Sequence, residues 1–259
     1  MKQQDKPIGI FDSGVGGISV LRAAVRELPH EDFCYFGDSA NAPYGPRPTA
    51  EVQRLSEAVV GHLLARKVKA IVIACNTATS AAAALLRQKY AALPIIGIEP
   101  AVKPAVEQHP GQQIIVMATP LTLREEKFTQ LAERYRQQAT IIPLAAPALV
   151  EFVEAGIMDT PAVHDYLHKL LAPYAATAAA VVLGCTHFPF VRAAIAQEMR
   201  PGIPIIDGGA GTARELRRQL EAKNLLNLQQ PAGQVAFENS TATPAMIQLS
   251  ERLFNEKDD

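Results

Sequence analysis

The sequence IVIACNTATS at residues 71–80 decides the fold, because it joins an apolar run of strand length to a polar helix start through Cys75. The sequence VVLGCTHFPF at residues 181–190 repeats this arrangement around Cys185. Short runs rich in Val and Ile, bounded by small polar residues, are typical of buried strands. We therefore expect two cysteine thiols at the carboxyl ends of two buried strands.

Outward from these two segments, apolar runs alternate with longer amphipathic stretches along the chain. The predicted strands cover residues 8–11, 32–37, 70–74, 94–98, 113–118, 139–144, 179–184, 204–207 and 234–239. The predicted helices cover residues 18–27, 49–67, 77–90, 122–138, 160–174, 190–199 and 244–254, with one more that ends at residue 220. Strands that alternate with helices predict an α/β fold with mainly parallel sheets.

The two halves of the chain resemble a diverged internal repeat. Cys75 and Cys185 lie 110 positions apart, and so do Pro94 and Pro204, each of which opens a Pro-Ile-Ile run. The first predicted strands of the two halves have nearly the same offset, 107 positions. Three matches in register predict two similar α/β modules related by pseudo-twofold symmetry.

The repeat also predicts how the chain divides into domains. We expect a first α/β domain of residues 1–98 together with 207–259, and a second α/β domain of residues 99–206. Ligands of open α/β sheets bind at the carboxyl ends of the strands. Because both cysteines are predicted at such ends, we expect the active site in the cleft between the two modules.

Composition and charge exclude several classes of protein. The chain has 259 residues with a net charge of −1, so neither nucleic acid nor an anionic membrane surface is expected as a partner. The polar start at residues 1–5 is unlike a signal peptide, and no apolar segment approaches the ~20 residues that span a bilayer. We therefore expect a cytoplasmic protein, in which the three cysteines are free thiols.

The two strand-end cysteines indicate thiol chemistry. A helix start offers unpaired N–H groups and a partial positive charge, which lower the pKa of a thiol. His187, two residues after Cys185, is placed to support a thiolate or to relay a proton. Three other interpretations are open: inert buried cysteines, a disulfide across the cleft, and a zinc site. Zinc is disfavoured because Cys-x-His is poor ligand spacing and no Cys-x-x-Cys occurs. The repetition at equivalent corners favours a reactive pair.

The glycine-rich sequence FDSGVGGIS at residues 11–19 is the second informative stretch. Its three glycines let the backbone approach a ligand, and the helix that follows is suited to binding a carboxylate. With Asp38 about 20 residues on, the stretch also approximates a dinucleotide-binding fingerprint. Two observations argue against that interpretation. Ser19 stands where the fingerprint has Gly or Ala, and Asp12 would face the pyrophosphate. Asp12 is either a turn former or an acid that exchanges a proton with a cysteine.

Two further segments carry candidate residues. The sequence SANAPYG at residues 39–45 is a loop whose Tyr44 either faces a ligand or covers the core. The sequence PALVEFVEAG at residues 147–156 places Glu151 and Glu154 on one helical face. That face is either solvated or holds an acid near Cys185.

The segments FDSGVGG, GDSANAPYG, ACNTAT, VEAG and LGCTHFP, in this order, resemble the glutamate racemases of the aspartate/glutamate racemase family. The resemblance implies interconversion of L-glutamate and D-glutamate without cofactor or metal, as a supply of D-glutamate for peptidoglycan synthesis. Many members of the family dimerise, so it also implies a homodimer. The alternatives are racemisation of another acidic amino acid, such as aspartate, and a non-catalytic or nucleotide-binding α/β protein.

The resemblance also implies roles for individual residues. Cys75 and Cys185 match the two catalytic thiols, of which the first deprotonates the D-isomer and the second the L-isomer. Asp12 matches the acid that assists the first thiol, His187 and Glu154 match the assistants of the second, and Asp38 matches a further acid near the site. The substrate-binding positions are Asp12, Ser13, Pro43, Tyr44, Gly45, Asn76, Thr77, Thr119, Thr186 and His187. The family often has proline at the position of Glu151, which leaves Glu151 open as an alternative to Glu154.

Overall fold

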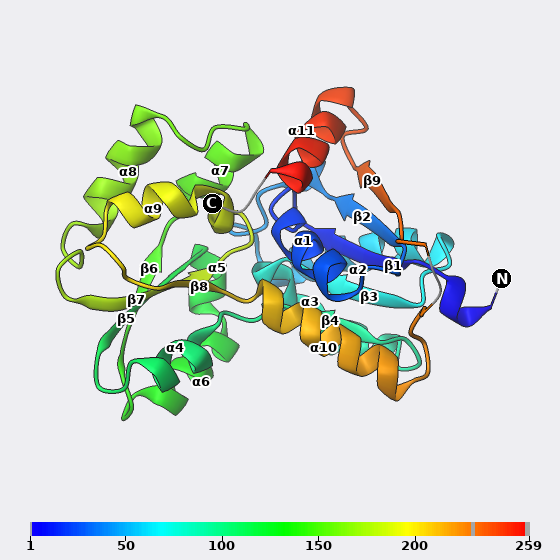
Figure 1. Ribbon diagram of the computed structural model, residues 1–259, viewed down its shortest axis with the longest axis horizontal. Coiled ribbons are helices and arrows are strands. Elements are labelled where there is room, and N and C mark those ends of the chain that lie inside the picture. The colour runs from blue at the N-terminus through cyan, green and yellow to red at the C-terminus, as the bar shows by residue number, and fades with distance from the viewer. Residues whose placement is uncertain (1, 229–230, 257–259) are drawn as a thin grey trace.

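The computed structural model describes residues 2–228 and 231–256, which form two sheets flanked by helices (Figure 1). In the first sheet the strand order is β4-β3-β1-β2-β9, and in the second it is β6-β5-β7-β8. The strands are β1 (Ile8–Asp12), β2 (Phe33–Gly37), β3 (Ala70–Ile73), β4 (Ile95–Gly97), β5 (Gln113–Ala118), β6 (Thr140–Ala145), β7 (Ala178–Gly184), β8 (Ile205–Asp207) and β9 (Val235–Asn239). Every described strand pairing is parallel, which confirms the predicted α/β fold.

The two sheets share one strand order. Four strands of the first sheet run β4-β3-β1-β2, and the second sheet read from its other edge runs β8-β7-β5-β6. The fourth strand along the chain therefore lies beside the third in each sheet, and the first lies beside the second. This correspondence is what the sequence repeat predicts for two similar α/β modules.

Helices cover both faces of each sheet. The helices are α1 (Ile18–Glu27), α2 (Thr49–Ala65), α3 (Asn76–Lys89), α4 (Val102–Gln108), α5 (Pro120–Arg124), α6 (Glu126–Tyr135), α7 (Ala148–Glu154), α8 (Pro161–Leu171), α9 (Arg192–Gln197), α10 (Gly209–Ala222) and α11 (Pro244–Asn255). On the first sheet α1 contacts α10 and α11, whereas α2 contacts α3. In Figure 1, α7, α8 and α9 lie above the second sheet, and α4 and α6 lie below it. Of the helices in the described part of the chain, none combines the length and apolar character needed to span a bilayer.

Two predicted helices differ from the structure. The predicted helix 122–138 is divided into α5 and α6 at Glu125, whose ψ of 140° is extended. The predicted helix 190–199 begins as a 3-10 turn, η3 (Phe188–Val191), before α9. The short helix α4 was not predicted. It contains Pro104 in its first turn, where a missing N–H breaks no helical hydrogen bond.

The core alternates between the two faces of the strands. In β1, Ile8 and Ile10 pack with α1, whereas Phe11 packs with α2 and α3. Side chains of a strand alternate in this way with a period of two. The cluster around Ile10 also includes Met117 and Leu183 of the second sheet, so one apolar core extends across both sheets. This shared core fixes the strand ends of the two sheets relative to each other.

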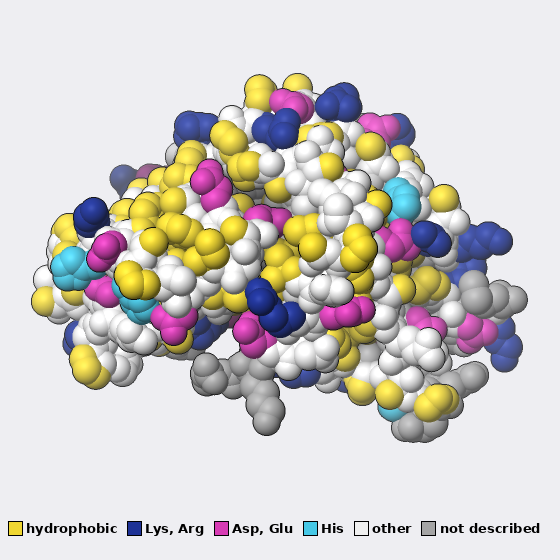
Figure 2. Space-filling model, turned by 90° about the horizontal axis from the view of Figure 1, so that it is seen from above, with side chains coloured by type: hydrophobic (Ala, Val, Ile, Leu, Met, Phe, Trp, Pro, Cys, Tyr) yellow, Lys and Arg dark blue, Asp and Glu magenta, His cyan; other side chains and the backbone are white. Residues whose placement is uncertain are grey.

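The end of the described chain returns to the first sheet. Strand β9 pairs with β2, so that Gly37 lies opposite Asn239. The face of the molecule seen in Figure 2 shows Lys and Arg side chains interspersed with Asp and Glu, in keeping with the net charge of −1. The added strand brings residues from the C-terminal part to the carboxyl ends of β1 and β2.

Candidate active site

Both strand-end cysteines lie at the carboxyl edge of their sheets. Cys75 follows β3 and caps α3, where its Sγ accepts the N–H of Ala78 at 3.4 Å. Cys185 follows β7 and precedes η3. Both are buried, with 5% and 6% of their surface exposed. The strand-to-helix corners predicted from the sequence are therefore present in both sheets.

The first thiol lies among acidic and hydroxyl groups. Cys75 Sγ donates to Ser13 Oγ at 3.7 Å. Burial raises the pKa of the Cys75 thiol, and the negative charges of Asp12 and Cys185 add to the increase, while the N–H of Ala78 opposes it. The N–H at the helix start thus lowers the pKa of this thiol as expected, but the lost solvation outweighs this one donor and the net shift is upward.

Asp12 ends β1 and is fully buried. Its Oδ2 accepts the N–H of Gly17 at 2.8 Å, at the start of α1. Its Oδ1 accepts Thr186 Oγ1 at 3.4 Å. Since Thr186 follows Cys185, Asp12 connects the corner of the first sheet with the corner of the second.

The second thiol lies against an imidazole and a carboxylate. Cys185 Sγ is 3.7 Å from His187 Nδ1, and His187 Nε2 is 2.7 Å from Glu154 Oε1. Burial opposes a charge on His187, but its contacts with Cys185 and Glu154 raise its pKa well above 6.5. The pKa of Glu154 shifts in the opposite direction: it is lowered despite burial, chiefly by the contact with His187. Both shifts favour a charged pair, an imidazolium with a carboxylate, whereas Glu151 on the same helix is exposed.

The glycine loop packs directly against this pair. A Cβ on Gly16 would lie 2.3 Å from His187 Nδ1, and a Cβ on Gly14 would lie 1.7 Å from Glu154 Oε1. The Gly14 carbonyl accepts the hydroxyl of Tyr35 at 2.6 Å. Glycine is needed here because any side chain would displace the histidine or the glutamate.

Asp38 follows β2 and orients the loop after it. Its Oδ2 accepts the hydroxyl of Tyr44 at 2.6 Å, and the amide of Asn41 donates to both carboxylate oxygens. Tyr44 is buried, and its pKa is raised by burial and by Asp38. Pro43, which precedes Tyr44, follows a cis peptide bond. The Asp38 carboxylate, which the fingerprint interpretation assigned to a ribose, is thus engaged with its own loop.

Three threonine hydroxyls, one from the first module and two from the second, lie together beside the loop that contains Tyr44 and Gly45. Thr77 Oγ1 and Thr119 Oγ1 are 2.8 Å apart, and both lie within 3.2 Å of Thr122 Oγ1. Gly45 adjoins them, since a Cβ on Gly45 would lie 3.0 Å from Thr119. Sequence reasoning missed Thr122, although its position three residues after the helix cap Thr119 was a usable signal. It also missed Ser39, which lies in the quoted loop, and Asn239, for which the sequence carries no signal.

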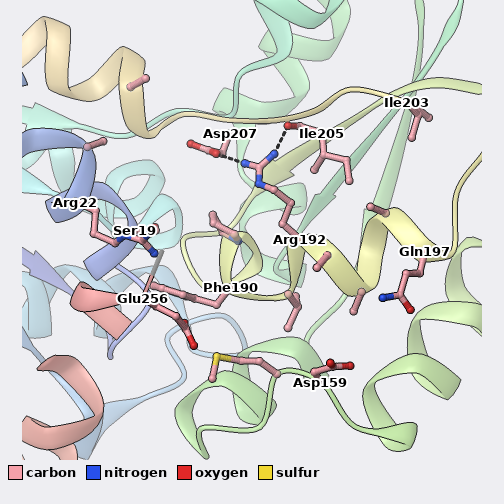
Figure 3. A pocket seen from close by; sticks show the side chains of 18 of the residues that line it. Ser19, Arg22, Asp159, Phe190, Arg192, Gln197, Ile203, Ile205, Asp207 and Glu256 are labelled. Carbon is pink, nitrogen blue, oxygen red and sulfur yellow. Dashed lines mark hydrogen bonds and ion pairs between the residues drawn. The ribbon is translucent and has the colours of Figure 1, made fainter. Parts of the chain in front are cut away.

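A separate groove of about 860 Å³ lies beside η3, α9 and β8 (Figure 3). Arg192 crosses it and donates to the Ile205 carbonyl and the Asp207 carboxylate. Ser19 lines the groove and donates to the carbonyl of Thr186 at 2.9 Å. None of the candidate site residues lines this groove, so it is not the candidate active site.

Comparison with known proteins places this geometry in a family. The model of the family described as Asp/Glu/Hydantoin racemase matches residues 9–216. A glutamate racemase from Clostridium botulinum is 49% identical over 254 residues, which cover 98% of each chain. These matches confirm the family resemblance that the motifs predicted.

Solved structures give the same result. The glutamate racemase of Thermus thermophilus in complex with beta-chloro-D-alanine is 37% identical, with a TM-score of 0.80 and coverage of 100% of this chain and 96% of that chain. The glutamate racemase of Francisella tularensis in complex with D-glutamate is 26% identical, with a TM-score of 0.84 and coverage of 99% and 96%.

Proposed function

Because this chain belongs to the Asp/Glu/Hydantoin racemase family, we propose that it is a glutamate racemase that interconverts L-glutamate and D-glutamate without a cofactor. The near full-length similarity to glutamate racemases supports glutamate as the substrate. The observation that carries the proposed chemistry is a pair of buried thiols, Cys75 and Cys185, each at the same corner of a similar sheet.

Two thiols suit the inversion of a stereocentre. Inversion requires that a proton leave one face of the α-carbon and that another arrive at the opposite face. One base would mostly return the proton to the face it came from, whereas two groups on opposite faces act in both directions. General acid–base catalysis by a positioned side chain contributes about 10²–10⁴-fold.

In the proposed reaction the two thiols exchange roles. Cys185, as a thiolate beside the His187 imidazolium, removes the α-proton of L-glutamate. Cys75, as a thiol, donates its proton to the opposite face, so that D-glutamate leaves with Cys75 as thiolate and Cys185 as thiol. The reverse reaction restores the first state. Burial and the charge of Asp12 raise the pKa of Cys75, and the charge of Cys185 adds to the increase, which supports a state in which only one sulfur is charged.

Asn76 supports a binding site for the polar groups of an amino acid. It is 3% exposed, and neither polar atom of its side chain has a hydrogen-bond partner among the described residues. Buried polar groups are normally paired, so the Asn76 amide is suited to a ligand. Asn76 also begins α3, whose N–H groups favour a carboxylate. We assign the other substrate contacts to Asp12, Ser13, Pro43, Tyr44, Gly45, Thr77, Thr119, Thr186 and His187.

The test is incorporation of solvent deuterium at the α-carbon, followed by proton NMR without added cofactor. Both enantiomers of glutamate should exchange and racemise, and both enantiomers of aspartate should react more slowly. If neither isomer of glutamate exchanged its α-proton with solvent, the proposed activity would be overturned. Faster exchange with aspartate would replace glutamate by aspartate as the substrate and leave the two-thiol chemistry intact.

Three wider assignments follow from the same proposal. D-glutamate made by this enzyme would supply peptidoglycan synthesis in the cytoplasm, and the enzyme would act as a homodimer. We propose residues 1–98 with 207–259 and residues 99–206 as the two domains, supported by the shared strand order of the two sheets. Gel filtration with light scattering tests the dimer.

A further inference from the structure

Glu154 receives more hydrogen bonds than its contact with His187 requires. Its Oε1 accepts the N–H of Val15 at 2.6 Å as well as His187, and its Oε2 accepts the hydroxyl of Ser39 at 3.0 Å. Val15 and Ser39 belong to loops at the carboxyl edge of the first sheet, whereas Glu154 ends α7 beside the second sheet. The carboxylate is thus fixed to the half of the molecule that does not carry Cys185.

Asn239 sets the direction of the Ser39 hydroxyl. The Oδ1 of Asn239 lies 3.0 Å from the backbone N of Thr241 and 2.8 Å from its Oγ1. A backbone N–H can only donate, so this atom of the amide is the acceptor and the NH₂ group faces Ser39. Asn239 Nδ2 then donates to Ser39 Oγ at 2.9 Å. Because Ser39 Oγ accepts this bond, its one hydrogen is available for Glu154.

We propose that Ser39 and Asn239 are positioning residues for Cys185: through Glu154 they hold His187 against the thiol. The proposal rests on the proposed racemase function. The chain of contacts runs from the end of β9 through Ser39 and Glu154 to His187, and it reaches the sulfur at 3.7 Å. Asn239 lies beyond residues 9–216, the part of the chain that the family model matches.

The physical argument is one of direction and geometry. A carboxylate with donors on both oxygens has one preferred rotation, whereas a carboxylate that loses the donor to Oε2 can turn about its last bond. Such a turn takes Oε1 away from His187, and the imidazole loses its orientation toward Cys185. Hydrogen bonds to charged groups are among the stronger ones in proteins, so loss of one in a partly buried site has a measurable effect.

The readout must separate positioning from loss of folded enzyme. The two enantiomers have equal free energy in water, so kcat/KM must remain equal in the two directions for every variant. The primary isotope effects need not remain equal. Slower proton transfer at Cys185 raises the isotope effect on kcat/KM for α-deuterated L-glutamate and lowers it for α-deuterated D-glutamate. A smaller fraction of active enzyme changes neither.

The experiment compares four variants with the wild type. Ser39→Ala and Asn239→Asp should each lower kcat/KM about tenfold and shift the two isotope effects in opposite directions. In Asn239→Asp the new carboxylate attracts the Ser39 hydrogen away from Glu154. Ser39→Thr keeps the hydroxyl, so its kcat/KM should stay within about threefold of wild type. Ser240→Ala is the matched control, because Ser240 Oγ accepts the N–H of Ala40 in the same loop without contacting Glu154.

Two results would overturn the inference while wild-type racemisation is intact. One is a Ser39→Ala enzyme with wild-type kcat/KM, and the other is a slower enzyme whose isotope effects are both unchanged. Failure of the wild-type enzyme to racemise glutamate would instead overturn the proposed function, so the two failures are distinguishable.

Discussion

The two thiol corners occupy equivalent places in sheets of the same strand order, yet their surroundings differ. Cys75 directly precedes α3, and its thiol contacts the Ser13 hydroxyl and is affected by the negative charge of Asp12. Cys185 precedes a 3-10 turn and lies against His187, which is held by Glu154. Among the described residues, the first corner thus places its thiol beside a hydroxyl and a carboxylate, whereas the second places its thiol beside the His187–Glu154 ion pair.

The difference shows that the internal repeat determines where the two sulfur atoms lie, whereas the neighbouring residues determine the charges around each of them. Two sulfur atoms in equivalent places could act on two faces of one carbon. Burial and the charge of Asp12 raise the pKa of the Cys75 thiol, whereas the imidazole of His187 lies beside the Cys185 sulfur. The predictions below test how far the corners differ.

The largest effect is expected from removing either thiol. Cys75→Ser and Cys185→Ser should each lower kcat for racemisation at least about 10³-fold, because a hydroxyl is a far weaker acid than a thiol. Circular dichroism of the glutamate solution measures racemisation. Cys75→Ser should still exchange the α-proton of L-glutamate with solvent, and Cys185→Ser should exchange that of D-glutamate. Racemisation at the wild-type rate in either variant would contradict the two-thiol assignment.

A smaller effect is expected when the glycine loop is filled at the second corner. Gly16→Ala should lower kcat about 10²-fold, because the new methyl group must displace the His187 ring. Gly61→Ala is the control, since a Cβ at Gly61 meets no atom within 4 Å. Gly61 lies inside α2, where alanine should raise the free energy of unfolding by about 0.5–1 kcal/mol. Unchanged kcat in Gly16→Ala would show that His187 need not remain in place.

The ion pair of the second corner predicts a pH dependence of stability. The raised pKa of His187 stabilises the fold below pH 6.5 and ceases to do so as pH rises through its folded value. The lowered pKa of Glu154 stabilises the fold above pH 4.5 and ceases to do so as pH falls through its folded value. Both contributions are complete between pH 4.5 and 6.5.

Glu154→Gln tests this window. The variant should lose about 2 kcal/mol of unfolding free energy between these two pH values, and less on either side. Thermal unfolding across pH 4–9 measures the difference from wild type. A difference that does not vary with pH would show that the pair is not charged in the folded protein.

The smallest effect is expected at the third cysteine, Cys34, which does not lie at a strand-to-helix corner. Cys34 lies inside β2, and burial together with the charge of Glu238 raises the pKa of its thiol to about 11. Cys34→Ser should leave kcat within about twofold of wild type, because serine can still donate to Glu238. A large loss of activity without loss of folded protein would give Cys34 a role that the comparison of the two corners does not include.

Segments with strong periodicity could be read from the sequence, and segments governed by packing could not. The run before Cys185 and the helix from Thr49 were predictable because burial leaves a local pattern of apolar residues along the chain. The capping role expected of Thr49 is wrong, since Pro48 is the N-cap and the Thr49 hydroxyl donates to Glu125. The division of helix 122–138 at Glu125 leaves no such pattern, since neither glycine nor proline marks it. There α5 contacts α3 while α6 contacts α4, so packing against two different partners overrides helix propensity.

The sequence by itself determined the α/β alternation, the repeat and the two cysteine corners, because each is encoded by residues near one another in the chain. Only the tertiary structure decided which groups surround each sulfur. The contact of Glu154 with Val15 spans 139 positions, and that of Asn239 with Ser39 spans 200. Such contacts depend on how all strands and helices pack together, and so does the loss of solvent that raises the pKa of Cys75.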